Sequence, residues 1–334
     1  AEAVIAAEFQ KFLMNGTLYQ GSKPVMWSPV EKTALAEAEV EYHDRKTDAV
    51  WVKFPVVRKT GAATIAVSPA EWTTPSPERS ARMKEMIARA HQASVVIWTT
   101  TPWTIPQNRA VAFNPTTRYS LYHIVDAGDS KTAATGDDLI LSEKLATEVF
   151  NAANVASFER VCDVHELDGL LLAHPFRCID GANGEWDFDV PLLPGDHVTD
   201  DAGTGFVHTA PSHGDDDYQI GRKYDLPMTH NILDDSSFRG DIPFFAGQQI
   251  IRPDGKPGGA NAVVIEKLKE VGALLATRRI TISDAHSWRS KAPVIRLNRP
   301  QWFAAIDREL DDGLDEPTGK NTIRDRALVS IDKL

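Results

Sequence analysis

Three hydroxyl side chains follow an apolar stretch in the first third of the chain. Thr99, Thr100 and Thr101 come directly after Val95–Ile97 and directly before Pro102. Alternation along a strand places Thr99 and Thr101 on one face and Thr100 on the other, and Pro102 ends regular pairing. Such hydroxyls can hold an ester carbonyl, a ribose hydroxyl or a water without any formal charge. The ordinary alternative is a strand end stabilised by cross-strand hydrogen bonds.

Histidines and carboxylates gather in a second segment, Gly203–Tyr218, whose pattern predicts a strand, a tight turn and a helix start. The acidic residues Asp215–Asp217 suit the positive end of that helix, and one of them could instead face an amine. His208 and His213 with these carboxylates could bind a divalent metal ion. Their spacing, however, matches neither an HExxH motif nor a paired-histidine motif.

The elements that must position these residues are mostly strands. Short β-branched runs separated by Pro and Gly begin at about residue 48. We expect helices at 1–14, at 142–153, where Ser142 could cap, and at 260–275. The fold class predicted is α+β and β-rich, with a closed or nearly closed sheet and helices on its outside. The expected strands are 50–57, 94–98, 109–113, 119–125 and 205–209.

The two ends of the chain differ from its middle. Gly21–Pro24 indicates a loop after the first helix, and the residues beyond 285 are rich in Trp, Arg and Pro, which indicates a connector. A charged helix is expected at Thr322–Leu334. His286–Ser290 resembles a place where related proteins carry a cysteine pair, but serines stand there, so we expect no zinc site.

Composition is that of an ordinary globular protein. The 334 residues are 42% hydrophobic and 25% charged, with a net charge of -11 at pH 7. This excludes wholesale disorder and opposes broad electrostatic binding of nucleic acid, so any RNA contact must be local. No apolar run could span a bilayer, and Cys162 and Cys178 form no CxxC pair. We expect a soluble, cytoplasmic protein with free thiols and no membrane partner.

Five segments, in this order, resemble isoleucyl-tRNA synthetases and extend over nearly the whole chain. The threonine block is specific, because leucyl and valyl relatives usually have an Arg-Pro pair after two threonines there. Neither the HIGH nor the KMSKS signature of the synthetic active site occurs in the chain. The resemblance therefore implies the editing insertion of such a synthetase, with a β-barrel core. The segments are Gly21–Trp27, Ala36–Tyr42, Thr99–Asn108, Gly203–Tyr218 and Gln301–Phe303.

The same resemblance implies a division of the chain into three parts. Residues 1–46 would be a flanking segment from the synthetase body, residues 47–285 the editing domain, and residues 286–334 a return connector. The chain would then be a piece of the synthetase that does not activate isoleucine.

The resemblance also implies catalytic roles. Asp217 corresponds to the carboxylate that pairs with the α-ammonium group of a misattached amino acid, a charge-assisted contact. Thr99, Thr100 and Thr101 correspond to hydroxyls that bind the terminal adenosine and position the ester and the attacking water. No general base is evident, so the mechanism would rest on positioning the water and polarising the carbonyl, with help from a ribose hydroxyl of the substrate.

Substrate binding would involve three further residues. His208 corresponds to a wall of the side-chain pocket whose bulk excludes isoleucine; without the resemblance, a hydrogen-bonded strand histidine would be expected. Asn108 would bind the substrate or hold the loop, and Trp103 would serve equally as a packing anchor. Ser212 stands where many relatives have glycine, a change that we do not expect to abolish activity.

The implied reaction is hydrolysis of valine wrongly attached to tRNA(Ile). It would need no cofactor and no metal, because ATP serves only the synthetic domain. Its partners would be the tRNA(Ile) 3′ end that carries valine and the rest of the synthetase chain. Two alternatives stay open: a noncatalytic module that grips the tRNA 3′ end, and a metal-dependent hydrolase built on His208 and His213, which chelators would stop.

Overall fold

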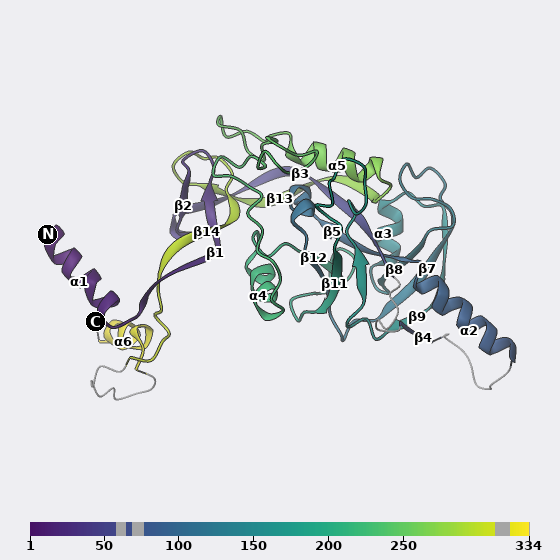
Figure 1. The fold of residues 1–334 in the computed structure, drawn as a ribbon, viewed down its shortest axis with the longest axis horizontal. Helices are drawn as coiled ribbons and strands as arrows, with labels where there is room; N and C mark the ends of the chain where they lie inside the picture. The colour runs from purple at the N-terminus through teal and green to yellow at the C-terminus, as the bar shows by residue number, and fades with distance from the viewer. Residues whose placement is uncertain (58–64, 69–76, 311–320, 334) are drawn as a thin grey trace. The chain divides into compact units, whose positions relative to one another are not determined.

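The computed structural model describes residues 1–57, 65–68, 77–310 and 321–333 (Figure 1). The chain divides into two compact units. One consists of Ala1–Lys23 with Asn298–Leu334, and the other is Pro24–Leu297. All of the predicted site residues belong to the second unit. The three-part division at residues 46 and 285 concerns the parent synthetase and stays a prediction.

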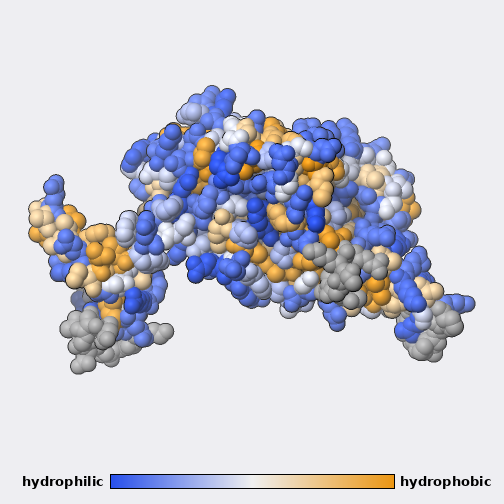
Figure 2. All heavy atoms as spheres, viewed as in Figure 1, coloured by the Kyte–Doolittle hydropathy of each residue, from blue (hydrophilic) through white to orange (hydrophobic). Residues whose placement is uncertain are grey.

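Helices lie near both ends of the chain in the first unit. The predicted N-terminal helix is confirmed as α1 (Glu2–Met14), and Gly16 follows it with a φ of +73°. The predicted C-terminal helix is confirmed as α6 (Ile323–Ile331), where Thr322 caps the first turn by accepting a hydrogen bond from the Asp325 N–H; Leu334 lies outside the described residues. Apolar side chains of α1 are exposed, and Figure 2 shows orange, hydrophobic residues on the surface of this helix.

The predicted loop at Gly21–Pro24 is wrong, because these residues belong to strand β1 (Leu18–Ser28), which pairs with β14 (Ile295–Ala304). Tyr19 stacks on Phe303 with ring centroids 5.5 Å apart, a contact between residues far apart in the sequence. Strand β2 (Thr33–Leu35) reaches only the last three residues of β1. Pro24 therefore lies in a part of β1 that β2 does not reach, so one edge of the strand is unpaired there and a missing N–H is tolerated.

As far as the chain is described, the largest sheet of the second unit has seven strands and is antiparallel except where β5 and β8 pair. Its longest ladder joins β13 to β3 over most of their lengths. In order across the sheet the strands are β13 (Leu274–Ser287), β3 (Val40–Pro55), β5 (Ser94–Thr99), β8 (Asp138–Ser142), β7 (Tyr119–Asp126), β9 (Ser157–His165) and β4 (Ala66–Ser68).

A second sheet has four strands: β10 (Leu171–Ala173), β11 (Asp189–Pro194), β6 (Ala110–Phe113) and β12 (Phe206–Thr209). The β-rich α+β class is confirmed, but the closed barrel is wrong for the described residues. Among the described residues, an isolated bridge between Val56 and Leu172 is the β-pairing that joins the two sheets. Closure would need a continuous ladder at this point, and Pro55, just before the bridge, cannot donate to one.

Both faces of the central strands are buried, which explains why their sequences are continuously apolar. Val95 and Ile97 of β5 belong to a core that includes Val190 and Leu192 of the second sheet. Val96, which points the other way, packs in a separate core with helix α3 (Ala146–Ala152). Strand β5 is therefore held from both sides, so its end can position side chains firmly.

In the described part of the second unit, four α-helices accompany the sheets, and one prediction about them needs correction. Ser142 does not cap α3, because it is the last residue of β8 and the helix begins four residues later. The helices are α2 (Pro77–Ala90), α3, α4 (Asp215–Lys223) and α5 (Ala260–Glu270). In the described ranges, no helix is long and apolar enough to cross a membrane.

Two turns are joined by the carboxylate of Glu31. Its Oε1 accepts hydrogen bonds from the Ser287 hydroxyl and the Ser290 N–H, both at 2.9 Å. Burial acts to raise the pKa of Glu31, but hydrogen bonds from Ser28, Ser287 and Ser290 outweigh it and lower the pKa below its ordinary value. The turn after β1 and the turn after β13 are thus held together by a carboxylate and hydroxyls.

Candidate functional site

The threonine triplet lies where regular strand structure stops. Strand β5 ends at Thr99, and Pro102 begins the short 3-10 helix η2 (Pro102–Gln107). The Thr99 hydroxyl accepts a hydrogen bond from the Thr101 N–H at 3.1 Å, which fixes the turn. Alternation would separate Thr100 from Thr101, but the strand has already ended, and both residues line the same cavity.

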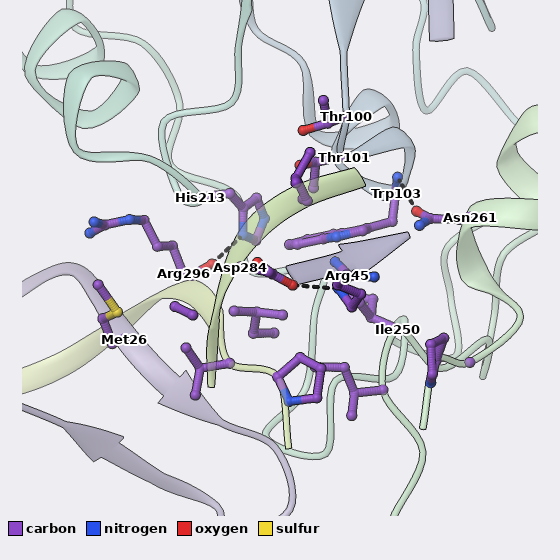
Figure 3. A pocket seen from close by; sticks show the side chains of 18 of the residues that line it. Met26, Arg45, Thr100, Thr101, Trp103, His213, Ile250, Asn261, Asp284 and Arg296 are labelled. Atoms are coloured by element: carbon purple, nitrogen blue, oxygen red, sulfur yellow. Dashed lines mark hydrogen bonds and ion pairs between the residues drawn. The ribbon is translucent and has the colours of Figure 1, made fainter. Parts of the chain in front are cut away.

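This cavity has a volume of about 310 Å³ and lies within the second unit (Figure 3). Its wall combines the β5–η2 connection with residues from β3, β13, β14, α5 and the turn that precedes α4. Figure 3 shows Thr101, Trp103 and His213 close together on one side, with Arg45 and Asp284 beneath them. The labelled lining residues are Met26, Arg45, Thr100, Thr101, Trp103, His213, Ile250, Asn261, Asp284 and Arg296.

Only part of the predicted site lines this cavity. Thr100, Thr101 and Trp103 do so, and the Trp103 N–H donates to Asn261 Oδ1 of α5 at 3.1 Å. The other four predicted residues do not line it. They are Thr99, Asn108, His208 and Asp217.

His208 lies in β12 and is linked to the threonine segment by hydrogen bonds. Its Nε2 lies 2.8 Å from the Thr104 hydroxyl, which in turn donates to the Thr101 carbonyl at 2.8 Å. The Asn108 amide nitrogen lies 3.2 Å from Nδ1 and also donates to the Ala110 carbonyl. Nδ1 therefore accepts and Nε2 carries the proton. Burial lowers the pKa of His208 to about 3, so the ring is neutral at physiological pH.

Asp217 lies in the first turn of α4, as the sequence predicts. Its Oδ2 accepts a hydrogen bond from the Ala210 N–H, just after β12, at 3.2 Å. Burial raises the pKa of Asp217 to about 7, and the nearby carboxylates of Asp215 and Asp216 act in the same direction. A Cβ on Gly214 would lie 2.9 Å from the same oxygen, so glycine keeps that side of the carboxylate uncovered. A cationic group arriving here would stabilise the charged form.

Two ion pairs border the cavity and were not predicted from the sequence. Arg45 of β3 pairs with Asp284 of β13, and Arg296 of β14 pairs with Asp215 of α4. Both pairs join segments far apart in the chain. These pairs place both positive and negative side chains on this wall, whereas the side formed by the threonines carries no charged group.

His213 also lines the cavity, although the sequence suggested it only as a metal ligand. Its Nδ1 lies 3.1 Å from the Arg296 carbonyl oxygen, and its ring packs edge-on against Trp103 with centroids 4.8 Å apart. Burial lowers the pKa of His213 to about 4. In the part of the chain that the structure describes, no three His, Cys, Asp or Glu side chains gather as metal ligands would.

Comparison with known proteins gives a consistent result. The family model for class I tRNA synthetases (I, L, M and V) matches residues 1–327. The chain is 49% identical to an isoleucine–tRNA ligase of Ruegeria pomeroyi over 341 residues, which cover 100% of this chain and 32% of the relative. It is 46% identical to the ligase of Bradyrhizobium diazoefficiens, covering 99% of this chain and 31% of the relative. The chain thus spans about a third of these relatives.

Among solved structures, the chain is similar to the P. falciparum cytosolic leucyl-tRNA synthetase editing domain. The match is 12% identical and covers 53% of this chain and 67% of that one. Its TM-score of 0.36 is too low to assign a fold.

Proposed function

This chain belongs to the class I tRNA synthetase family, and from that premise we propose that it hydrolyses valine wrongly attached to tRNA(Ile). Valine and isoleucine differ by one methylene, which a pocket distinguishes by only about 1–3 kcal/mol; the isoleucine enzymes are the established example of this limit. A second, hydrolytic site that admits valine and excludes isoleucine removes the remaining errors. The similarity to isoleucine–tRNA ligases supports this choice among the synthetases.

The observation that carries the proposal is the cavity lined by Thr100 and Thr101, two residues with hydroxyl side chains. Its volume of about 310 Å³ is at the lower end of the range of about 300–1,000 Å³ for small-ligand sites. A site of that size suits a small aminoacyl ester on a terminal nucleoside. The two hydroxyls would orient the ester carbonyl and a water for attack, with no charge introduced.

Asp217 would supply the charge that the threonine side lacks. Its carboxylate would pair with the α-ammonium group of the aminoacyl ester, and this cation would lower the pKa that burial raises. The proposal requires the amino end of the substrate to reach past His213 and Gly214 to this carboxylate. His208, fixed on both ring nitrogens, would be the rigid wall that excludes the additional methylene of isoleucine.

The test is direct. Val-tRNA(Ile) and Ile-tRNA(Ile) are incubated with the purified 334-residue chain, and the loss of each ester is compared with buffer alone. We expect rapid loss of the valyl ester, slow loss of the isoleucyl ester and no effect of EDTA. Equal rates for both esters, or no rate above buffer, would contradict the proposal, and tight binding without turnover would favour a tRNA-binding module.

A further inference from the structure

His213 differs from the other histidine of this region in having one unused nitrogen. The Arg296 carbonyl oxygen beside Nδ1 can only accept, so Nδ1 carries the proton of the neutral ring. Nε2 is therefore an acceptor. This atom is buried and has no hydrogen-bonding partner among the described residues.

An acceptor of this kind is expected to find a partner. A buried polar atom without a partner has lost its hydrogen bonds to water and gained none in return, so native structures seldom keep one without a ligand or water to satisfy it. The ring lines the same cavity as Thr100 and Thr101, and Trp103 packs against it (Figure 3). The Arg296 carbonyl and the Trp103 ring together fix the orientation of the imidazole.

We propose that Nε2 of His213 accepts a hydrogen bond from an O–H group of the reaction, either the attacking water or the free ribose hydroxyl of the terminal nucleotide. This inference rests on the proposed function, to which it adds the missing acceptor. The threonine hydroxyls then donate to the ester while His213 orients the O–H group.

The protonation state of the ring suits this task. Burial keeps the pKa of His213 at about 4, so the lone pair on Nε2 is available throughout the neutral range. A base this weak orients an O–H group and does not remove its proton completely in the ground state.

Two substitutions separate this role from a structural one. His213→Asn places an amide N–H near the Nδ1 position, so it keeps the bond to the Arg296 carbonyl but loses the acceptor. His213→Gln places an amide oxygen near the Nε2 position and loses that bond. We expect His213→Asn to lower kcat for the valyl ester about tenfold with KM little changed, and His213→Gln to stay within about threefold of the unchanged protein.

The reverse order, with Asn active and Gln inactive, would show that His213 serves only to hold the loop and would overturn the inference. Equal activity of both variants and the unchanged protein would also overturn it, while the proposed function would stand. Absence of hydrolysis by the unchanged protein would instead contradict the proposed function itself.

Two further measurements complete the test. A tRNA that ends in a deoxyadenosine without the free ribose hydroxyl identifies the source of the O–H group: the effect of His213→Asn should vanish with it if the ribose is the partner, and persist if water is. In the unchanged protein, the ¹⁵N resonance of His213 Nε2 should move towards its hydrogen-bonded position when a nonhydrolysable valyl-adenosine analogue binds. An unmoved Nε2 resonance at saturation would overturn the inference, even if the variants fail to fold.

Discussion

The β5–η2 connection and the β12–α4 connection lie on either side of the same site and present different chemical groups to it. The first presents neutral hydroxyls whose hydrogen bonds are shared among Thr99, Thr101 and Thr104. The second presents one partly buried carboxylate, Asp217, whose pKa desolvation raises to about 7. In the proposed reaction, the roles on the neutral side are therefore distributed over several groups, and the role on the charged side falls to one group. Substitutions should divide in the same way.

The largest effect is expected at the charged side. Asp217→Ala removes the proposed partner of the α-ammonium group, and we expect kcat/KM for Val-tRNA(Ile) to fall about 100-fold, the value of a lost charge-assisted hydrogen bond. Asp216→Ala is the matched control, because this neighbouring carboxylate is exposed. Similar losses for both variants, measured by single-turnover hydrolysis, would mean that the helix start needs only negative charge.

The pH dependence sharpens the contrast. A carboxyl with a raised pKa is charged only above that pKa, so Asp217 loses its charge as the pH falls below about 7. We expect kcat/KM to fall by up to about tenfold per pH unit between pH 7 and pH 5. His208 and His213 stay neutral there, because their pKa values are about 3 and 4. Asp217→Asn should lose this slope; a slope that survives would assign it to another group.

A smaller effect is expected on the neutral side. Thr100→Val keeps the volume of the side chain but removes the hydroxyl of a lining residue, and we expect a roughly fivefold loss of kcat for a neutral hydrogen bond. Thr99 lies outside the lining, but its hydroxyl fixes the turn, so Thr99→Val should lower the free energy of unfolding while it costs less than about twofold in kcat. The comparison uses the valyl ester at saturation. If Thr99→Val proved the more damaging of the two, the cavity would not be where the ester sits.

The smallest effect is expected at Ser212, whose hydroxyl is buried without a hydrogen-bonding partner among the described residues. Ser212→Ala removes that unpaired group, so the free energy of unfolding should rise by about 1 kcal/mol. Hydrolysis should stay within about twofold of the unchanged protein, because Ser212 does not line the cavity. Urea denaturation measures the first quantity; a loss of stability would show that the hydroxyl has a bound water as partner.

Local signals in the sequence predicted the fold well where each element depends on its own residues. The helices α1 and α5 end near glycines, and β5 and β12 are short apolar runs, so their positions could be predicted. Strand β1 was missed because its pairing with β14 depends on residues almost 300 positions away, such as Tyr19 with Phe303. Sheet closure could not be predicted for the same reason, since it depends on which strands meet.

The site shows the same limit. The two segments that carry hydroxyls and carboxylates were identified from residue types and from resemblance, and Thr100, Thr101 and Trp103 do line a common cavity. Asn261 and the pair of Arg45 with Asp284 could not be found, because folding brings them in from distant segments. His213 had a signal, its place beside Asp217, but its partner Arg296 lies 83 residues further along the chain.

The carboxylate of Glu31 that joins the turns after β1 and β13 has a practical consequence. A junction made of a carboxylate and serine hydroxyls has no thiolate to oxidise and no ion to extract, so peroxide and chelators should leave it intact. The junction is sensitive to acid instead, because protonation of Glu31 removes its charge. Because the pKa of Glu31 is lowered in the folded protein, its stabilising effect is present above the ordinary pKa of glutamate and disappears as the pH falls through the lowered one.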